Sequence, residues 1–222
     1  YSTLQTIENT KLAKECGADS VLVVTPFYNR PTQEGLFQHF TAVANGVDIP
    51  MVLYNHPGRT GQNIETTTIK KLAQIPSIVG VKDASGSITQ MGDVIATLRE
   101  QRPDFSIMSG DDSLLLPLMA LGGDGVISVV GNLFPGLLRQ MMNAIQRNDL
   151  IAAQAIHYRL LPLLKALAVE TNPAPIKYAM ELSGMAVGGL RLPLCEVSAE
   201  SKEKITEAVN SLFYSNEEAL TR

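Results

Sequence analysis

The stretch Ile78-Val79-Gly80-Val81-Lys82-Asp83-Ala84-Ser85-Gly86 decides how the chain is interpreted. Its first four residues, apolar apart from a glycine, predict a strand covered on both faces, and the strand delivers a lysine to a polar turn. Loss of solvent lowers the pKa of an ammonium group, which makes the neutral amine available for Schiff-base chemistry with a carbonyl substrate. The alternative is a strand-end lysine whose stem packs while its ammonium group reaches water. The rest of the chain decides between the two.

Strand-like and helix-like segments alternate on both sides of this stretch. Short apolar runs predict four more strands, at residues 21–24, 50–55, 105–108 and 125–130. Apolar residues at helical spacing predict helices between them, which begin near Thr3, Thr32, Asn63 and Ser87. Asn63 is an expected helix cap, and Ser87 begins a capping box with Gln90. Strands separated by helices in this regular order predict a parallel sheet.

Two parallel α/β architectures compete, the doubly wound sheet and the (β/α)8 TIM barrel. A dinucleotide-binding sheet should carry G-x-G-x-x-G at a strand-to-helix turn, and none of the turns here has it. Polar residues stand at the carboxyl end of nearly every strand, where a barrel places its active site. We therefore expect a barrel. Because only five strands can be counted, the sequence looks like a barrel that lacks its first three βα units.

This architecture makes specific predictions about organisation. Residues 1–148 are expected to form the partial barrel with its last five strands, and residues 149–222 a C-terminal helical region, in which Ser198 caps the last helix. The strands at 21–24 and 126–130 should be the two edges of the sheet and should not pair with each other. The chain begins at Tyr1, with neither an initiator methionine nor a signal peptide, which fits a missing front.

Composition excludes several classes of protein. The chain has 222 residues, of which 45% are hydrophobic and 18% charged, so a sizeable core is expected and disorder is not. A net charge of -4 with scattered Lys and Arg offers no surface for nucleic acid. No apolar run reaches the roughly 20 residues of a membrane span. Cys16 and Cys195 are isolated, which predicts a reduced, cytoplasmic protein.

The polar residues at the strand ends are the candidates for a site. They are Tyr28, Tyr54, Asn55, Arg59, Lys82, Asp83, Ser109, Gly110, Asp111 and Ser128. Tyr54 could relay protons for an imine, although an interior tyrosine with a satisfied hydroxyl is the commoner case. Arg59 could bind a carboxylate, or be solvated. Asp111-Asp112 is poor evidence for a metal site and more typical of a helix cap, so no metal is expected, and no chemistry is assigned to the three histidines.

Four motifs occur in order along the chain. They are Val24-Thr25-Pro26-Phe27-Tyr28-Asn29-Arg30-Pro31, Tyr54-Asn55-His56-Pro57-Gly58-Arg59-Thr60-Gly61, Gly80-Val81-Lys82-Asp83 and Ser109-Gly110-Asp111-Asp112. Together they resemble the dihydrodipicolinate synthase family, which are pyruvate-dependent class I aldolases on a (β/α)8 barrel. The resemblance runs from near Tyr1 to past Leu194.

The resemblance implies a role for each matching residue. Lys82 matches the lysine that forms the imine with pyruvate, and Tyr54 matches the tyrosine that relays protons above it. Tyr28 matches a second tyrosine that reaches across a subunit interface into the neighbouring relay. The third relay member of the family is a threonine in a Gly-Thr-Thr-Gly-Glu segment, and this sequence has no such segment.

The substrate-binding residues follow in the same way. Arg59 matches the arginine that holds the carboxylate of aspartate semialdehyde, while Gly110 and Ile127 match positions that line the pyruvate pocket. The resemblance therefore implies condensation of pyruvate with aspartate semialdehyde in lysine and diaminopimelate biosynthesis, without a cofactor, in a homotetramer arranged as a dimer of dimers. The alternatives are a sister aldolase, of the N-acetylneuraminate lyase or hydroxy-oxo-acid aldolase type, and an inactive fragment that serves as an interaction module.

Overall fold

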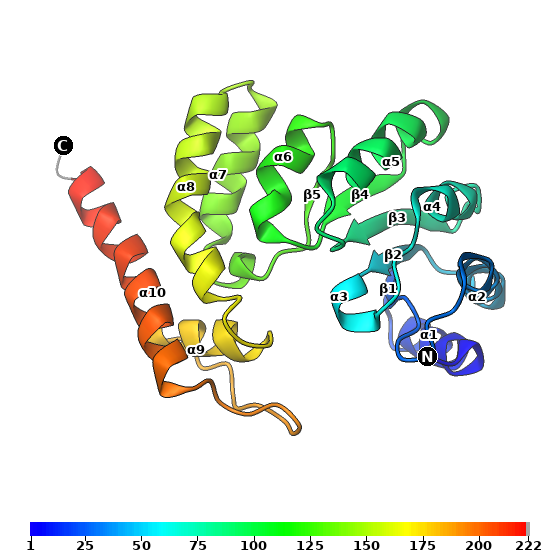
Figure 1. Ribbon diagram of the computed structural model, residues 1–222, viewed down its shortest axis with the longest axis horizontal. Coiled ribbons are helices and arrows are strands. Elements are labelled where there is room, and N and C mark those ends of the chain that lie inside the picture. The colour runs from blue at the N-terminus through cyan, green and yellow to red at the C-terminus, as the bar shows by residue number, and fades with distance from the viewer. Residues whose placement is uncertain (221–222) are drawn as a thin grey trace. The chain divides into compact units, whose positions relative to one another are not determined.

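A computed structural model describes residues 1–220, with side chains as far as residue 213. The chain divides into two compact units, Tyr1–Ile127 and Ser128–Arg222. The first unit consists of βα repeats and the second of helices (Figure 1). The expected boundary after residue 148, between a partial barrel and a helical region, stays a prediction.

The first unit is built on one parallel sheet of five strands. Their order in the sheet is their order in the sequence, so the two outermost strands are edges and do not pair with each other, as predicted. Every neighbouring pair is parallel. The strands are β1 (Val21–Val24), β2 (Met51–Asn55), β3 (Ile78–Asp83), β4 (Ser106–Ser109) and β5 (Gly125–Val126).

The last strand is shorter than the sequence predicts. The apolar run to residue 130 suggested a longer strand, but only Gly125 and Val126 pair with β4. The reason is that β4 itself ends at Ser109, whose carbonyl accepts a hydrogen bond of 2.9 Å from the amide of Ile127. Past that point β4 offers no further residue for pairing, and apolar character alone does not extend a ladder.

A bulge interrupts the pairing of β2 with β3. Met51 pairs with Ile78, whereas the next residue, Val52, pairs with Gly80, so Val79 is the additional residue. After the bulge the register continues regularly and sets Tyr54 opposite Lys82. A bulge of this kind changes the face to which the following side chains point.

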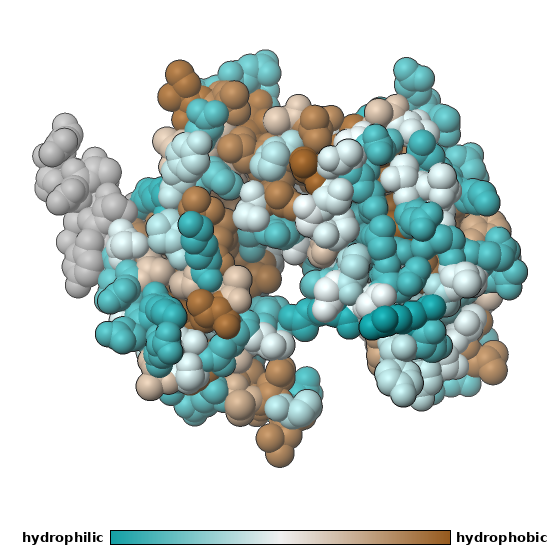
Figure 2. Space-filling model, viewed as in Figure 1, coloured by the Kyte–Doolittle hydropathy of each residue, from teal (hydrophilic) through white to brown (hydrophobic). Residues whose placement is uncertain are grey.

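Helices cover one face of the sheet. In Figure 1 helices α1, α2, α4 and α5 follow one another along this face, and consecutive members of the row are in contact. Their outer surface over α4 and α5 is predominantly hydrophilic (Figure 2). The helices of this unit are α1 (Thr3–Glu15), α2 (Gln33–Gly46), α3 (Pro57–Thr60), α4 (Thr66–Leu72), α5 (Ile88–Gln101) and α6 (Leu115–Ala120), with a 3-10 turn η1 (Asp112–Leu114).

The core lies between these helices and the sheet. Phe40 from α2, Leu98 from α5 and Leu53 from β2 are fully buried there. Burial of each such side chain stabilises the fold by about 1.5–3 kcal/mol relative to its exposure. Outside the bulge in β3, alternate strand residues point into this core and the intervening residues point to the opposite face.

Of the two helix caps expected in this unit, Ser87 is confirmed and Asn63 is wrong. The side chains of Thr32 and Ser87 accept hydrogen bonds from the first turns of α2 and α5. Asn63 caps nothing, because α4 begins only at Thr66. Its amide is engaged instead with the side chains of Asn55 and Gln90.

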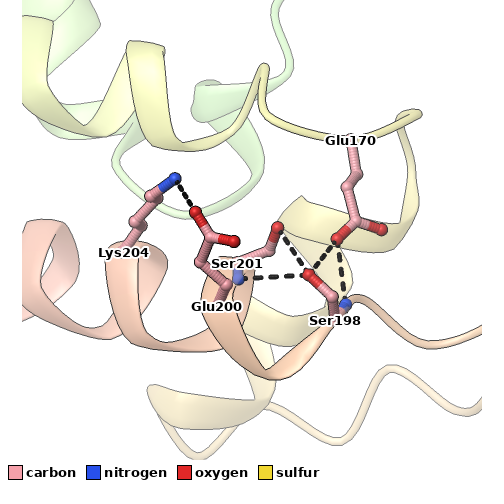
Figure 3. Close-up of polar contacts among 5 residues, drawn as sticks. All are labelled: Glu170, Ser198, Glu200, Ser201 and Lys204. Atoms are coloured by element: carbon pink, nitrogen blue, oxygen red, sulfur yellow. Dashed lines mark hydrogen bonds and ion pairs between the residues drawn. The ribbon is translucent and has the colours of Figure 1, made fainter.

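The second unit contains the predicted helices. They pack α7 on α8, α8 on α10 and α9 on α10. Ser198 begins the last helix as expected: its hydroxyl accepts a hydrogen bond of 3.3 Å from the Ser201 amide (Figure 3). Glu170 accepts bonds of 2.9 and 2.8 Å from the amide and hydroxyl of the same serine. The helices are α7 (Pro135–Gln146), α8 (Leu150–Ala166), α9 (Ala174–Leu182) and α10 (Ala199–Leu220), with a 3-10 turn η2 (Val130–Asn132).

Among the described residues, no helix combines the length and the apolar composition that crossing a bilayer requires.

Candidate active site

The centre of the site is the pair formed by Lys82 and Tyr54. They lie opposite each other on β3 and β2, so their side chains stand side by side on the face of the sheet that the helix row does not cover. The ammonium nitrogen Nζ of Lys82 is 4.2 Å from the centroid of the Tyr54 ring. The two residues that the family resemblance assigns to the imine and to proton relay are therefore in contact.

The surroundings of Lys82 favour its neutral form. Partial burial lowers the pKa of its amine below the ordinary value, and the positive charge of Arg59 adds to this effect. The carboxylate of Asp112, which is buried, acts in the opposite direction but does not outweigh desolvation. A depressed pKa raises the fraction of the nucleophilic amine near neutral pH, which imine formation requires.

The surroundings of Tyr54 favour the protonated form of its phenol. Partial burial raises the pKa of its phenol, and the charge of Arg59 offsets only part of that rise. The hydroxyl is therefore protonated at neutral pH and can donate to an oxygen or nitrogen that gains charge nearby. The Lys82 ammonium group contacts the face of the ring that carries this hydroxyl.

Gly110 leaves room for the lysine stem. A Cβ atom at this position would lie 2.8 Å from the Cβ of Ala84 and 3.0 Å from the Cε of Lys82. The amide of Gly110 also donates a hydrogen bond of 2.7 Å to the carbonyl of Asp83, which ties the end of β4 to the end of β3. Gly110 therefore shapes the space in which the amine lies.

Arg59 lies in the short helix α3, which begins three residues after Tyr54. Pro57 opens this helix and Gly61 ends it in the left-handed conformation, with a φ of 76°. The hydroxyl of Thr60 is bonded to that of Thr25 at 3.1 Å, which fixes α3 against the end of β1. Arg59 is exposed, and its charge acts on both Tyr54 and Lys82. An exposed guanidinium whose charge reaches the Lys82 amine attracts a carboxylate that approaches the amine.

Tyr28 is not brought to the pair. Its side chain is 91% exposed on the loop after β1, where its φ is 73°. Ile127 is nearer to the site in the fold, since its amide bonds the carbonyl of Ser109, the residue before Gly110. Within one chain the structure therefore gathers Lys82, Tyr54 and Gly110 closely, while Tyr28 lies apart.

Two neighbours of the pair escaped the sequence analysis. The ring of His56 packs edge-on against Tyr54, with centroids 5.8 Å apart, and burial lowers its pKa. Asp112 acts electrostatically on Lys82, whereas Asp111 caps η1 by accepting a bond of 2.9 Å from the Ser113 amide. The position of His56 directly after a strand was a usable signal. Nothing in the sequence distinguished Asp112 from Asp111.

The part of the chain that the structure describes contains no group of three His, Cys, Asp or Glu side chains that could hold a metal ion.

Comparison with known proteins agrees with this geometry. A profile of the Dihydrodipicolinate synthetase family matches residues 1–212. The 4-hydroxy-tetrahydrodipicolinate synthase of Protochlamydia amoebophila is 50% identical over 212 residues, which are 96% of this chain and 71% of that protein. The crystal structure of dihydrodipicolinate synthase from Thermotoga maritima superposes with a TM-score of 0.92 at 40% identity, and covers 95% of this chain and 72% of that one.

A third similar structure carries a ligand. It is the chloride-inhibited dihydrodipicolinate synthase from Acinetobacter baumannii complexed with pyruvate, with a TM-score of 0.90 and 40% identity. The match covers 95% of this chain and 72% of that one. Structural similarity at this identity, together with a family profile that spans nearly the whole sequence, leaves a single assignment. The chain belongs to the dihydrodipicolinate synthetase family.

Proposed function

We propose that this protein is a Schiff-base-forming lyase that condenses pyruvate with aspartate semialdehyde, the reaction of a 4-hydroxy-tetrahydrodipicolinate synthase. The observation that carries the proposal is the Lys82–Tyr54 pair, with a desolvated amine 4.2 Å from the ring of a protonated phenol. The names of its relatives at 44–50% identity support the same reaction.

The reaction starts from the neutral amine of Lys82. Its nitrogen attacks the ketone carbon of pyruvate, and loss of water gives a protonated imine. The positive imine nitrogen acidifies the adjacent methyl group, and loss of a methyl proton gives an enamine. The enamine carbon attacks the aldehyde carbon of the second substrate. The amine of that substrate then closes the ring on the imine carbon and releases Lys82.

The other residues assist this sequence without a cofactor, because the lysine itself serves as the electron sink. Tyr54 donates and accepts protons as the imine forms and breaks down, since its pKa keeps the hydroxyl protonated between transfers. Arg59 binds the carboxylate of aspartate semialdehyde. The backbones of Gly110 and Ile127 line the place of pyruvate. Arg59 argues against a sister aldolase that acts on sugar acids, as do the names of the relatives.

Two further features belong to the proposal. The exposed Tyr28 would enter the proton relay of a neighbouring subunit in a homo-oligomer arranged as a dimer of dimers, which gives its unusual exposure a reason. The unpaired, exposed Cys16 and Cys195 suit a reducing compartment, and we place the enzyme in the cytoplasm.

Reductive trapping tests the function. The full-length protein is incubated with pyruvate and borohydride, digested, and mapped by mass spectrometry. A reduced pyruvyl adduct is expected on Lys82, and the Lys82→Arg variant should carry none. Lys70 and Lys71, in the last turn of α4, serve as internal controls. An adduct spread over these lysines, with none on Lys82, would refute the proposed mechanism.

A further inference from the structure

A buried hydrogen-bond cluster lies directly behind the Lys82–Tyr54 pair. Its centre is Asp83, which is 2% exposed and follows the lysine in β3. One carboxylate oxygen of Asp83 accepts bonds of 2.8 and 2.5 Å from the amide and hydroxyl of Ser85. The other accepts bonds of 3.0 Å from the side-chain amide of Asn55 and 3.1 Å from that of Gln90. Four donors match the acceptor capacity of an ionised carboxylate.

Asn55 is the second member of this cluster and follows Tyr54 in β2. It is fully buried, and its amide nitrogen bonds both Asp83 and the side-chain oxygen of Asn63, the latter at 2.8 Å. Its own side-chain oxygen accepts a bond of 2.9 Å from the amide of Ile64. Both N–H groups of the Asn55 side chain and one lone pair of its oxygen are therefore used.

The Asn55–Asp83 pair and the Tyr54–Lys82 pair lie on opposite faces of the sheet. Asn55 and Asp83 are register partners, one position beyond the partners Tyr54 and Lys82. Because successive side chains alternate between faces, the reactive pair stands on one face and the Asn55–Asp83 bond on the other. The Asn55–Asp83 hydrogen bond thus joins the ends of β2 and β3 on the helix-covered face. Tyr54 and Lys82 stand on the opposite face of the same two strand ends.

We propose that Asn55 and Asp83 are positioning residues whose hydrogen bond holds Lys82 against Tyr54 in the geometry that imine formation needs. The inference rests on the proposed function of Lys82 and goes beyond it by assigning a role to groups that do not touch the substrate. A fully satisfied buried polar cluster is rigid, and loss of one member leaves others unpaired. A displacement of about 1 Å at a reacting group can cost about 100-fold in rate.

The Asp83→Asn variant tests this role. The new NH2 group would face donors in either orientation, the side chains of Asn55 and Gln90 or the backbone amide of Ser85, while the size of the side chain is unchanged. We expect the rate of reductive pyruvate trapping at Lys82 in the folded, full-length protein to fall about 10- to 100-fold. The pH profile of trapping should also move to higher pH, because a lysine that leaves its desolvated place is more easily protonated.

A charge-preserving exchange provides the rescue. In the double variant Asn55→Asp with Asp83→Asn, donor and acceptor trade places and the bond between the strand ends can form again. We expect this variant to recover at least half of the lost rate on a logarithmic scale, which a purely local packing defect would not do. Gln33→Ala is the matched control. It removes bonds to the Asn63 carbonyl, the Glu65 amide and the Thr68 hydroxyl, none of which lies at the two strand ends.

The outcomes separate this inference from the proposed function. If the unchanged protein fails to trap pyruvate at Lys82, the proposed function fails. If it traps pyruvate and Asp83→Asn traps it equally fast at the same pH, the positioning role is wrong. An equal loss in Gln33→Ala would also overturn it, because general destabilisation would then suffice. Should Asp83→Asn not fold, Ser85→Ala and Gln90→Leu, which each remove one donor to Asp83, allow the same comparison.

Discussion

Gly110 lies so close to Lys82 that a single methyl group on its Cα would come within 3.0 Å of the Cε atom of the lysine. The same methyl would meet the Cβ of Ala84 at 2.8 Å, so the backbone has little freedom to yield. We expect Gly110→Ala to lower the rate of pyruvate trapping at least tenfold, because the lysine stem must move away from Tyr54.

The control for this variant is Gly92→Ala in the interior of α5. A Cβ there would meet only the Cδ1 of Leu121, at an ordinary 3.5 Å. Alanine in place of glycine within a helix stabilises by roughly 0.5–1 kcal/mol. Gly92→Ala should therefore keep the wild-type trapping rate and melt at the same or a higher temperature. Equal trapping rates in both variants would show that the contact with Lys82 is unimportant.

Arg59 should act mainly on the second substrate, because its charge is the smallest of the three influences on the pKa of Lys82. Loss of a charge-assisted contact with a carboxylate costs a few kcal/mol. We expect Arg59→Ala to lower kcat/KM for aspartate semialdehyde about 100-fold, while the rate of pyruvate trapping changes by less than about threefold. Arg59→Lys keeps the charge but loses the planar fork, and should fall between the two. A matching loss in trapping and in turnover would argue against a role confined to the aldehyde substrate.

His39 should make the protein sensitive to mild acid. Burial lowers the pKa of its imidazole from 6.5 to about 4, and its Nδ1 is bonded to the Thr3 hydroxyl at 2.9 Å. Between these two values the unfolded chain binds a proton that the folded chain does not. Stability therefore falls as pH drops from about 6.5 towards 4, by up to about 2 kcal/mol.

The His39→Gln variant removes this titration. We expect urea unfolding of the wild-type protein to lose about 2 kcal/mol more than the variant between pH 7 and pH 4.5. Carboxylates titrate in both proteins, so their effect cancels in the difference. Parallel pH dependences of the two proteins would mean that His39 is not buried in its neutral form.

Ser198 should stabilise the last helix through its cap. Replacement of a capping serine by alanine typically costs about 1 kcal/mol. Hydrogen bonds from Ser201 and Ser198 also lower the pKa of Glu170, so this part of the stability is present above pH 4.5 and is lost as pH falls through the lower, folded pKa. Ser211→Ala, further along α10, is the control, because its hydroxyl bonds only a helix carbonyl, that of Ala208. Equal unfolding midpoints for the two variants at pH 7 would contradict the prediction.

Much of the fold could be predicted because short-range patterns determine it. Apolar runs located all five strands, and their regular alternation with helices fixed their order and the two edges. Where the prediction failed, tertiary pairing decided. The strand from Gly125 stops early because β4 ends at Ser109. Asn63 does not cap a helix because its side-chain oxygen accepts a hydrogen bond from the buried side-chain amide of Asn55. Neither fact is visible in local sequence.

The site was predicted only in part. Position at a strand end, together with a family resemblance, was enough to select Lys82 and Tyr54, which the structure brings into contact. The resemblance also selected Tyr28, whose role requires a second subunit and stays a prediction. His56 was overlooked although it follows a strand and lies two residues from Tyr54, whereas Asp112 was overlooked because its effect on Lys82 acts between two neighbouring strand ends. Pairwise electrostatics of this kind cannot be read from spacing along the chain.

The additional residue, Val79, shifts the alternation of side chains between the two faces of β3 by one position. Ile78 shares its face with Met51, deep in the helix-covered core, and a strand of unbroken alternation would have sent Lys82 to that same side. Because of this one apolar residue, the even-numbered positions of β3 change face after Ile78. Lys82 therefore lies on the open face and not in the core. Substitutions that keep the bulge should be tolerated at this position. Loss or gain of a single residue between Ile78 and Lys82 should instead exchange the nucleophile and Asp83 between the front and the back of the sheet.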